Sequence, residues 1–341
     1  MTHTIFITSP LEAEHVETLR AVSPDVRVLY EPELMPALRY VADHKGVPHV
    51  RTAEQTARFR ACLAEADILF DLPSAEDLPF CGRLRWVQTT STGVGPAVAA
   101  LGLDRTEVLV TTARGVHAGP LAEFVFMALL AHFRGLAHLQ AEQRAHRWVR
   151  YCGEEVAGRT IVTIGAGDLA RGVARIGQAL GMRLIAVARD TAKARPDGLF
   201  DEVVPASQLH AALAKADAVV VTVPGLPSTL NMIDAAALSA MPAGCALVNI
   251  GRGTVVDEAA LIEALRSGHV GFAALDVTAV EPLAEDSPLW DLPNVLISPH
   301  SASTVSRENA KITAIFVENL RLWVAGRVGE MRNVLDKGLM Y

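Results

Sequence analysis

A glycine-rich turn is the part of the chain whose residue types and spacing point most directly to chemistry. The run from Gly165 to Ala170, GAGDLA, fits the pattern GxGxxG/A with alanine in the third place. In this pattern the first glycine permits a tight turn and the second lets the backbone approach a pyrophosphate. The third small residue lets the following helix pack against the strand, and the start of that helix favours an anion. The turn therefore predicts a dinucleotide site.

The elements on either side of the turn must position it. We expect an apolar strand at 159–164, a helix at 169–180 and a second strand at 183–188. A strand before the turn and a helix after it distinguish a binding motif from a chance cluster of glycines.

The end of the second strand bears on the choice between NAD and NADP. An acidic residue about 20 residues beyond the turn would accept the ribose 2′-hydroxyl of NAD, whereas an arginine there could hold the 2′-phosphate of NADP. The expected acidic position is Ala188, and Arg189 follows it, with Lys193 and Arg195 nearby. This favours NADP. Asp190 lies one or two places later, so NAD stays open.

The wider pattern predicts an α/β fold with two doubly wound, Rossmann-like parallel sheets. Val- and Ile-rich runs without polar alternation suit strands covered on both faces. They place further strands of a second domain, residues 102–298, at 218–223, 246–250, 272–276 and 295–298. Earlier strands are expected at 4–8, 26–29, 67–70 and 84–88. These belong to a first domain, residues 1–101 plus 299–341, onto which a helix at 307–324 should fold back.

Two segments do not follow this alternation. Residues 30–52 contain three prolines and read as a long loop, a kind of segment that is usually functional or disordered. Its basic residues could face an acidic substrate. The helix expected at 120–136 is apolar on nearly all sides and must therefore be buried on nearly all sides. It is either a central helix between the domains or one that also packs on a second subunit, which predicts a homodimer.

Composition excludes several classes of protein. The 341 residues suffice for about two domains, and the net charge of −7 argues against a nucleic-acid partner. No apolar run approaches the ~18 residues of a membrane helix, and the first residues lack the basic and apolar regions of a signal peptide. The four cysteines form no CxxC pair, so we expect no metal site and a cytoplasmic location.

Ordered motifs along nearly the whole chain resemble the D-isomer-specific 2-hydroxyacid dehydrogenase family. The resemblance implies two α/β domains, the cofactor domain inserted into the substrate domain, with a cleft between them. The motifs are TARGVHA at 112–118 with Ala122-Glu123, GAGDLA at 165–170, VNIGRG at 248–253, ALDV at 274–277 with Glu281-Pro282, and SPHSA at 298–302.

The resemblance implies three catalytic groups whose chemistry suits a 2-oxo acid. The planar fork of Arg252 can bind a carboxylate and polarise the neighbouring ketone. His300 would donate or accept the proton, since histidine does so near neutral pH. Glu281 would hydrogen-bond the imidazole and orient it. Backbone N–H groups around Thr92 and Gly93 resemble the family's carboxylate-binding turn.

The resemblance and the glycine pattern together define a set of expected cofactor contacts, in which Asp276 would sit beside the nicotinamide. The expected residues are Gly165, Gly167, Asp168, Leu169, Ala170, Arg189, Val223, Pro224, Ile250, Gly251 and Asp276.

These observations predict an NAD(P)-dependent oxidoreductase that moves a hydride to or from C2 of a small 2-hydroxy or 2-oxo acid, of the glyoxylate/hydroxypyruvate reductase kind. Glu281 argues against the formate dehydrogenase branch, where a glutamine pairs with the histidine. The alternative is a dinucleotide-sensing regulatory protein on the same fold, which fold alone does not exclude.

Overall fold

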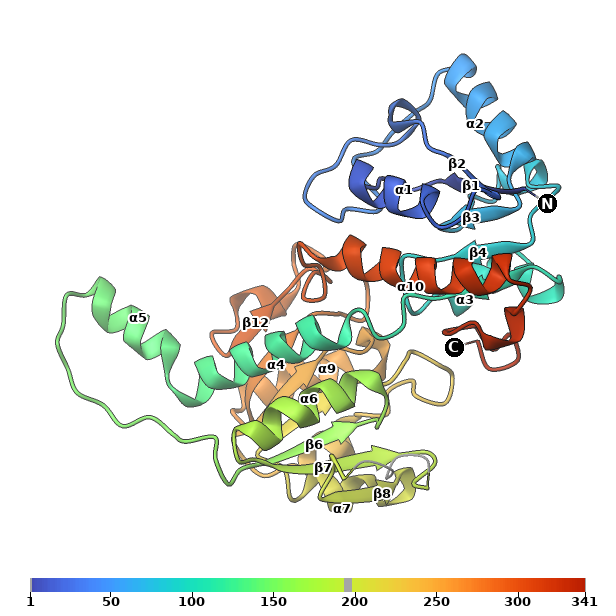
Figure 1. Cartoon of the computed structure of the whole chain (residues 1–341). Helices are drawn as coiled ribbons and strands as arrows, with labels where there is room; N and C mark the ends of the chain where they lie inside the picture. Colours follow the sequence, from blue (N-terminus) through green and yellow to red (C-terminus); the bar gives the residue numbers. More distant parts are fainter. Residues whose placement is uncertain (1, 193–197, 341) are drawn as a thin grey trace. The chain divides into compact units, whose positions relative to one another are not determined.

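The computed structural model describes residues 2–192 and 198–340, so Lys193 and Arg195 lie outside the described residues. The chain divides into two compact units (Figure 1). The first unit comprises Met1–Val116 and Thr304–Tyr341, and the second, His117–Ser303, is inserted between these two segments.

The unit boundaries differ from the predicted divisions at 101/102 and 298/299. The first difference comes from a strand that was not predicted from the sequence, β5 (Leu109–Thr111), which pairs in parallel with β4 (Trp86–Gln88). That pairing keeps residues 102–116 in the first unit.

The first unit is built on a five-stranded sheet whose described strands are all parallel. In spatial order they are β2 (Val26–Leu29), β1 (His3–Ile7), β3 (Ile68–Phe70), β4 and β5. The helices of this unit are α1 (Ala13–Arg20), α2 (Ala53–Glu65), α3 (Gly95–Ala100) and α10 (Glu308–Val324).

Alternation along β1 contributes side chains to two of the apolar clusters of the first unit. Ile5 and Ile7 pack in a cluster that includes α1 and α10, whereas Phe6 packs in a second cluster with α2. Successive side chains of a strand point to opposite faces, so the stretch Ile5–Ile7 of β1 is apolar on both faces of the sheet. The predicted return of the C-terminal helix is confirmed, because Phe316 of α10 lies 5.1 Å from the ring of Trp86.

The second unit is built on a seven-stranded sheet, again with all described strands parallel. The strand order reverses between β6 and β9, which are neighbours although β7 and β8 separate them in sequence. In spatial order the strands are β12 (Val295–Ile297), β11 (Val270–Leu275), β10 (Cys245–Asn249), β9 (Ala218–Val221), β6 (Thr160–Ile164), β7 (Arg183–Ala188) and β8 (Glu202–Pro205). The fold class expected from the sequence is thus confirmed in both units.

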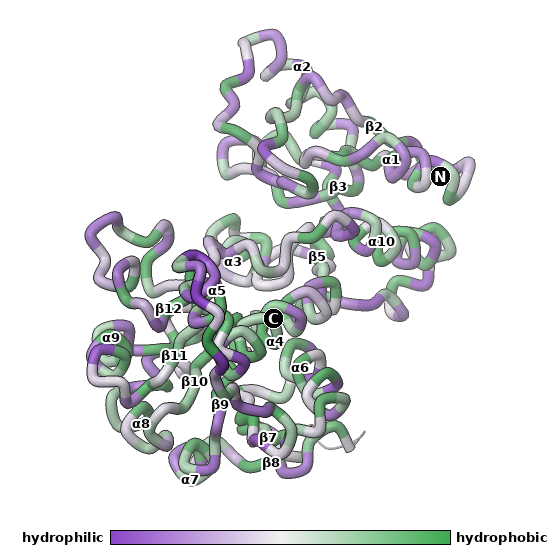
Figure 2. The backbone as a smooth tube through the Cα atoms, turned by 90° about the vertical axis from the view of Figure 1, so that its left-hand side faces the viewer, coloured by the Kyte–Doolittle hydropathy of each residue, from purple (hydrophilic) through white to green (hydrophobic). Residues whose placement is uncertain are grey.

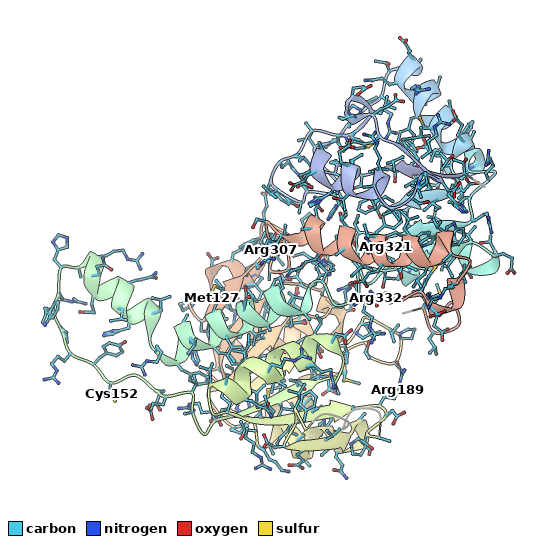
Figure 3. All side chains as sticks on the ribbon, in the orientation of Figure 1. Met127, Cys152, Arg189, Arg307, Arg321 and Arg332 are labelled. Atoms are coloured by element: carbon cyan, nitrogen blue, oxygen red, sulfur yellow. The ribbon has the colours of Figure 1, made fainter. Side chains whose placement is uncertain are left out.

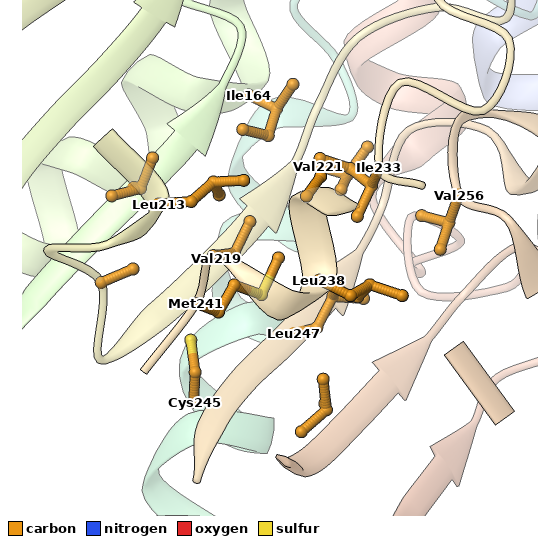
Figure 4. Packing of buried hydrophobic residues seen from close by; sticks show 14 of the residues in the cluster. Ile164, Leu213, Val219, Val221, Ile233, Leu238, Met241, Cys245, Leu247 and Val256 are labelled. Atoms are coloured by element: carbon orange, nitrogen blue, oxygen red, sulfur yellow. The ribbon is translucent and has the colours of Figure 1, made fainter. Parts of the chain in front are cut away.

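Helices cover both faces of the second sheet. One apolar cluster joins the strands to α7 (Leu209–Leu213), α8 (Ala235–Ser239) and α9 (Glu258–Arg266), and Figure 4 shows part of this packing. The cluster on the other face includes α4 (Ala118–Phe133) and α6 (Asp168–Ala179).

The apolar helix expected at 120–136 corresponds to α4, and only Leu136 of that range belongs to the next helix. It ends at Phe133, Gly135 adopts a left-handed conformation (φ 67°), and α5 (Leu136–Arg144) begins after it. Among the described residues no single helix is long and apolar enough to cross a membrane; α4 and α5 reach that length only together, with a 60° bend between them.

Packing against α6 buries one side of α4. A Cβ added at Gly172 of α6 would lie 2.7 Å from the carbonyl oxygen of Ala118, so glycine allows the two helices to approach closely. On other sides of α4, Met127 and Leu130 are 52% and 36% exposed. Helix α5 buries none of its residues and extends away from the sheet of its own unit as a mainly hydrophilic segment (Figures 1 and 2).

Candidate functional site

The predicted glycine turn lies at the carboxyl end of β6, beside the point where the strand order reverses. Gly165 has a φ of 109°, and a Cβ there would lie 2.6 Å from Oγ1 of Thr222. Gly167 is the N-cap of α6 and supplies no side-chain cap to the helix. Ligands of open α/β sheets gather at such a reversal. The turn therefore has the backbone shape and the helix terminus that a pyrophosphate requires.

The loops after β9 and β10 border the same edge. Val223 and Pro224 follow β9, and Ile250 and Gly251 follow β10. A Cβ on Gly251 would lie 2.6 Å from the carbonyl oxygen of Val223, so the two loops are in close contact. The residues predicted to bind the cofactor from these loops are thus brought to the edge that carries the glycine turn.

The end of β7 has the form expected from the sequence. The last strand residue is Ala188, which is buried, and Arg189 follows it on the surface (Figure 3). Asp190 is also exposed, and its Oδ1 accepts a hydrogen bond from the backbone N–H of Ala192 at 3.1 Å. A small side chain therefore stands where an acidic residue would accept the ribose 2′-hydroxyl.

Arg252 stands in a loop that a buried asparagine holds in place. Asn249, the last residue of β10, is 1% exposed; its Nδ2 donates to the carbonyl oxygen of Arg252 at 3.1 Å, and its Oδ1 accepts from the N–H of Gly251 at 3.0 Å. A Cβ on Gly253 would overlap the carbonyl group of Thr278, so only glycine fits there. The loop is thus rigid on both sides of the half-buried arginine.

His300 and Glu281 form a direct pair. Nδ1 of His300 lies 2.7 Å from Oε2 of Glu281, and the other carboxylate oxygen accepts the N–H of Thr278 at 3.3 Å. Both side chains are partly open to solvent, at 45% and 38% exposure. Because Glu281 engages Nδ1, Nε2 is the ring nitrogen left to exchange a proton with a bound molecule.

Asp276 holds the backbone around His300. Its side chain is buried, and Oδ1 accepts hydrogen bonds from Ser298 Oγ at 2.7 Å and from the N–H groups of Ser301 and Ala302 at 2.9 Å each. Its carbonyl oxygen accepts the N–H of His300 at 2.9 Å. His300 itself has a φ of 54°. A left-handed conformation is costly for a non-glycine residue and persists where its surroundings hold it, often at functional sites.

Neighbouring strands therefore bring three predicted catalytic residues to one edge. Arg252 follows β10, Glu281 follows β11 and His300 follows β12, and these strands are adjacent in the sheet. An arginine and an oriented histidine that follow neighbouring strands at one sheet edge have the chemistry to bind an anion and to exchange a proton with it.

Thr92 and Gly93 belong to the first unit, whereas the other predicted site residues belong to the second. They are exposed in the turn between β4 and α3. The start of this turn is fixed, because Thr90 Oγ1 donates to Asp71 Oδ2 at 3.0 Å. An exposed turn with a fixed start can present its backbone N–H groups to an anion.

Asn249 and Ser298 lie within the motifs at 248–253 and 298–302, but no role was predicted for either of them from the sequence. A buried asparagine at the end of an otherwise apolar strand was the signal available for Asn249, because a buried polar group requires a hydrogen-bond partner. Within the described residues no group of three or more His, Cys, Asp or Glu side chains could hold a metal ion.

Comparisons with known proteins agree with this arrangement. The family described as "D-isomer specific 2-hydroxyacid dehydrogenase, NAD binding domain" matches residues 126–302. A D-3-phosphoglycerate dehydrogenase of Mycobacterium leprae is 38% identical over 240 residues, which are 67% of this chain but 45% of that protein. The chain thus spans less than half the length of that relative. A glyoxylate reductase of Korarchaeum cryptofilum is 31% identical over 80% of this chain and 82% of its own.

A solved structure extends the similarity to the whole chain. The D-isomer specific 2-hydroxyacid dehydrogenase of Xanthobacter autotrophicus Py2, in complex with NADPH and MES, is 28% identical. It superposes with a TM-score of 0.77 over 100% of this chain and 99% of its own.

Proposed function

The chain belongs to the D-isomer specific 2-hydroxyacid dehydrogenase family, and we propose that it transfers a hydride between a nicotinamide cofactor and C2 of a small 2-oxo or 2-hydroxy acid. The observation that carries the proposal is the His300–Glu281 pair on the strand edge that also presents Arg252. These groups supply the proton transfer and the anion binding that reduction of a 2-oxo acid needs.

Arg252 is proposed to bind the substrate. Its guanidinium would bind the carboxylate of the 2-oxo acid and hydrogen-bond the neighbouring ketone oxygen. This interaction strengthens as negative charge develops on that oxygen, so it lowers the barrier as well as binding the ground state. The clamp by Asn249 fixes the backbone at Arg252 and so limits the positions of the guanidinium.

His300 is proposed as the acid in reduction and the base in oxidation. When bound, the reduced nicotinamide supplies the hydride to C2. Nε2 of His300 would donate its proton to the ketone oxygen, which becomes the hydroxyl of the product. Glu281 would hold the ring so that Nε2 faces the substrate and would stabilise the charge on the protonated ring.

The two units are proposed to share the work as a substrate domain and a cofactor domain. The first unit would contribute the backbone N–H groups of Thr92 and Gly93 to the substrate carboxylate. The second would bind the pyrophosphate of the cofactor at the glycine turn. The loops after β9 and β10 would contact the remainder of the cofactor. NADP is the proposed preference because β7 ends in Ala188 followed by Arg189.

We also propose that the protein is a cytoplasmic homodimer that associates through the segment 120–136. The exposed Met127 and Leu130 of α4 and the exposed Leu136 at the start of α5 support this interface, since apolar side chains gathered on one segment favour association. The physiological substrate is proposed to be a small 2-oxo acid such as glyoxylate or hydroxypyruvate, without a nucleic acid or a membrane as partner.

The test is turnover of a panel of 2-oxo acids, each with NADPH and with NADH, followed by the nicotinamide absorbance. Arg252→Ala is the matched control, because it removes one site group while leaving the fold. We expect oxidation of the reduced cofactor with at least one short 2-oxo acid and loss of that activity in the variant. Tight NADPH binding without turnover of any acid would instead indicate a dinucleotide-sensing protein.

A further inference from the structure

The long connection between β2 and α2 in the first unit has a well-defined internal structure. Its centre is Asp43, whose side chain is 1% exposed. The carboxylate accepts hydrogen bonds from Nε of Arg39 at 2.7 Å, from Nη2 of Arg39 at 2.9 Å and from the N–H of Gly46 at 3.0 Å. These bonds from Arg39 hold the pKa of Asp43 well below its usual range. A buried, fully engaged carboxylate of this kind fixes the backbone around it.

Further contacts fasten this connection to the body of the unit. The imidazole of His44 lies 3.4 Å from Oε1 of Glu308 at the start of α10. Nε of Arg51 donates to the carbonyl oxygen of Leu34 at 2.9 Å, and its guanidinium lies 3.6 Å from the ring centre of Phe59. The connection is therefore held to the body of the unit from two sides.

The connection lines an open hollow of about 410 Å³ on the surface of the unit. Four basic side chains line it, and Pro36 and Pro48 form part of the wall. The basic residues are Arg39, Lys45, His49 and Arg51. No acidic side chain is among the residues that line it.

The charges around the hollow do not cancel. Asp43 neutralises Arg39. The nearest carboxylate to Arg51 is that of Asp77, 3.9 Å from Nη1, and Asp77 is also bound by Arg60 at 3.1 Å. Lys45 forms no ion pair with any residue that the structure describes. The hollow thus carries a positive excess in a chain whose net charge is −7.

Arg51 is pre-organised to bind an anion. Its side chain is 23% exposed, and stacking on Phe59 together with the bond to Leu34 fixes the plane of the guanidinium. Burial lowers the pKa of Arg51, and an anion beside it would oppose that effect. A guanidinium held in one orientation loses little entropy when its remaining N–H groups bind an oxyanion.

We propose that this hollow is a binding site for a phosphate group, held by Arg51 and Lys45. Phosphate carries more charge than a carboxylate and suits a planar guanidinium together with a point charge from lysine. The hollow is open to solvent, so it can accept a phosphate group that belongs to a larger molecule. Binding here does not depend on the hydride transfer proposed above, because Arg252, Glu281 and His300 take no part in it.

The test measures binding of inorganic phosphate to the full chain by equilibrium dialysis, with saturating NADPH present so that the cofactor site is occupied. Wild type is compared with Lys45→Ala and Arg51→Gln. Arg20→Ala is the matched control, since Arg20 is an exposed arginine of the same unit that pairs with Glu17 outside the hollow. Lys45 is exposed, so its variant keeps the test valid if Arg51→Gln fails to fold.

We expect Lys45→Ala and folded Arg51→Gln to weaken phosphate binding about 10-fold or more, as loss of a charged hydrogen bond does. Arg20→Ala should change it less than about 2-fold, because the attraction of a distant exposed charge is screened. Equal binding by wild type and Lys45→Ala, or an equal loss in Arg20→Ala, would overturn the proposal.

A second arm identifies where the phosphate comes from. KM is measured for 2-oxo acids with and without a terminal phosphate, in wild type and Lys45→Ala. A rise in KM confined to the phosphorylated acids shows that the hollow binds the far end of the substrate. Unchanged KM values together with weakened phosphate binding show a separate phosphorylated ligand. Either result supports the site, and the dialysis arm decides it even if no acid is turned over.

Discussion

The hydroxyl of Ser298 donates a 2.7 Å hydrogen bond to Oδ1 of Asp276, and the same oxygen accepts the N–H groups of Ser301 and Ala302. One buried carboxylate oxygen therefore holds the Ser298 side chain before His300 and the backbone after it. The residue expected from the family resemblance to sit beside the nicotinamide is, in this geometry, also the support of the proposed acid–base histidine.

Replacement of Asp276 by alanine should lower both the stability of the protein and its kcat. Three donors would lose their acceptor, and each buried unsatisfied group costs about 1–3 kcal/mol. We expect the free energy of unfolding in urea to fall by at least ~2 kcal/mol and kcat to fall because His300 loses its position. Asp276→Asn keeps an acceptor oxygen and should retain most of the stability. A stability of Asp276→Ala equal to that of wild type would contradict this role.

Arg252→Ala should lower kcat/KM for the best 2-oxo acid by about 10²-fold or more, as removal of one electrostatic stabiliser does in other enzymes. Arg252→Lys keeps the charge without the planar fork, so its kcat/KM should lie between those of wild type and Arg252→Ala. Arg266→Ala, an exposed arginine of α9 paired with Glu263, serves as the control and should act like wild type. Activity of Arg252→Ala within a few-fold of wild type on every acid would exclude the assignment.

His300 and Glu281 should act as one unit. His300→Gln should lose ~10²- to 10⁴-fold in kcat, the range typical of a general acid–base group, and Glu281→Gln should lose less. The double variant should be no slower than His300→Gln alone, because Glu281 acts only through the ring that it orients. Losses that multiply in the double variant would show that the two residues act independently.

The exposed part of α4 predicts a homodimer in solution. Light scattering at micromolar concentration should give twice the mass of the chain. Met127→Lys, which places a charge at the labelled position in Figure 3, should shift the protein towards monomer. Leu230→Lys is the control, since Leu230 is 61% exposed in the same unit but not on α4. A monomeric wild type would refute the interface.

The sequence predicted best those elements whose signal is local. The bounds of β6, β7 and α6 agree with expectation to within a residue, because a continuous apolar run, a glycine turn and a helical pattern follow one another there. Two short strands, β5 and β8, with three and four residues, were not predicted from the sequence. Runs so short carry little periodicity, and tertiary pairing decides them. Helix α2 was not predicted either, although Thr52 and Gln55 form a capping box at its start.

The candidate site likewise contains features that the sequence predicts and features that it does not. The sequence predicted that Arg252 and His300 lie at one sheet edge, because each follows an apolar strand and the carboxyl ends of parallel strands meet at one edge. The hydrogen bonds of Asp276 could not be predicted from the sequence. They join residues 22 to 26 positions apart, and no sequence pattern indicates such pairs. Nor did the sequence indicate that Asp43 organises the 30–52 loop from within, because its burial results from the fold of that loop.

The end of β7 predicts that NADPH is preferred over NADH. Ala188 offers no carboxylate to the 2′-hydroxyl of NADH and no negative charge to repel a 2′-phosphate, and the exposed Arg189 can pair with that phosphate. One charged hydrogen bond contributes roughly 1.5–3 kcal/mol, which corresponds to about 10- to 150-fold discrimination. The measurement is kcat/KM for both cofactors with the same 2-oxo acid.

Variants at this strand end separate the two contributions to cofactor choice. Arg189→Ala should raise KM for NADPH and leave KM for NADH nearly unchanged, whereas Ala188→Asp should lower KM for NADH by giving its 2′-hydroxyl an acceptor. Arg183→Ala is the control, because Arg183 begins the same strand at its opposite end and pairs with Glu202. Asp190 is the competing candidate for the ribose, although its Oδ1 already accepts the N–H of Ala192. A wild-type kcat/KM for NADH equal to or above that for NADPH would show that Asp190, and not Arg189, sets the preference.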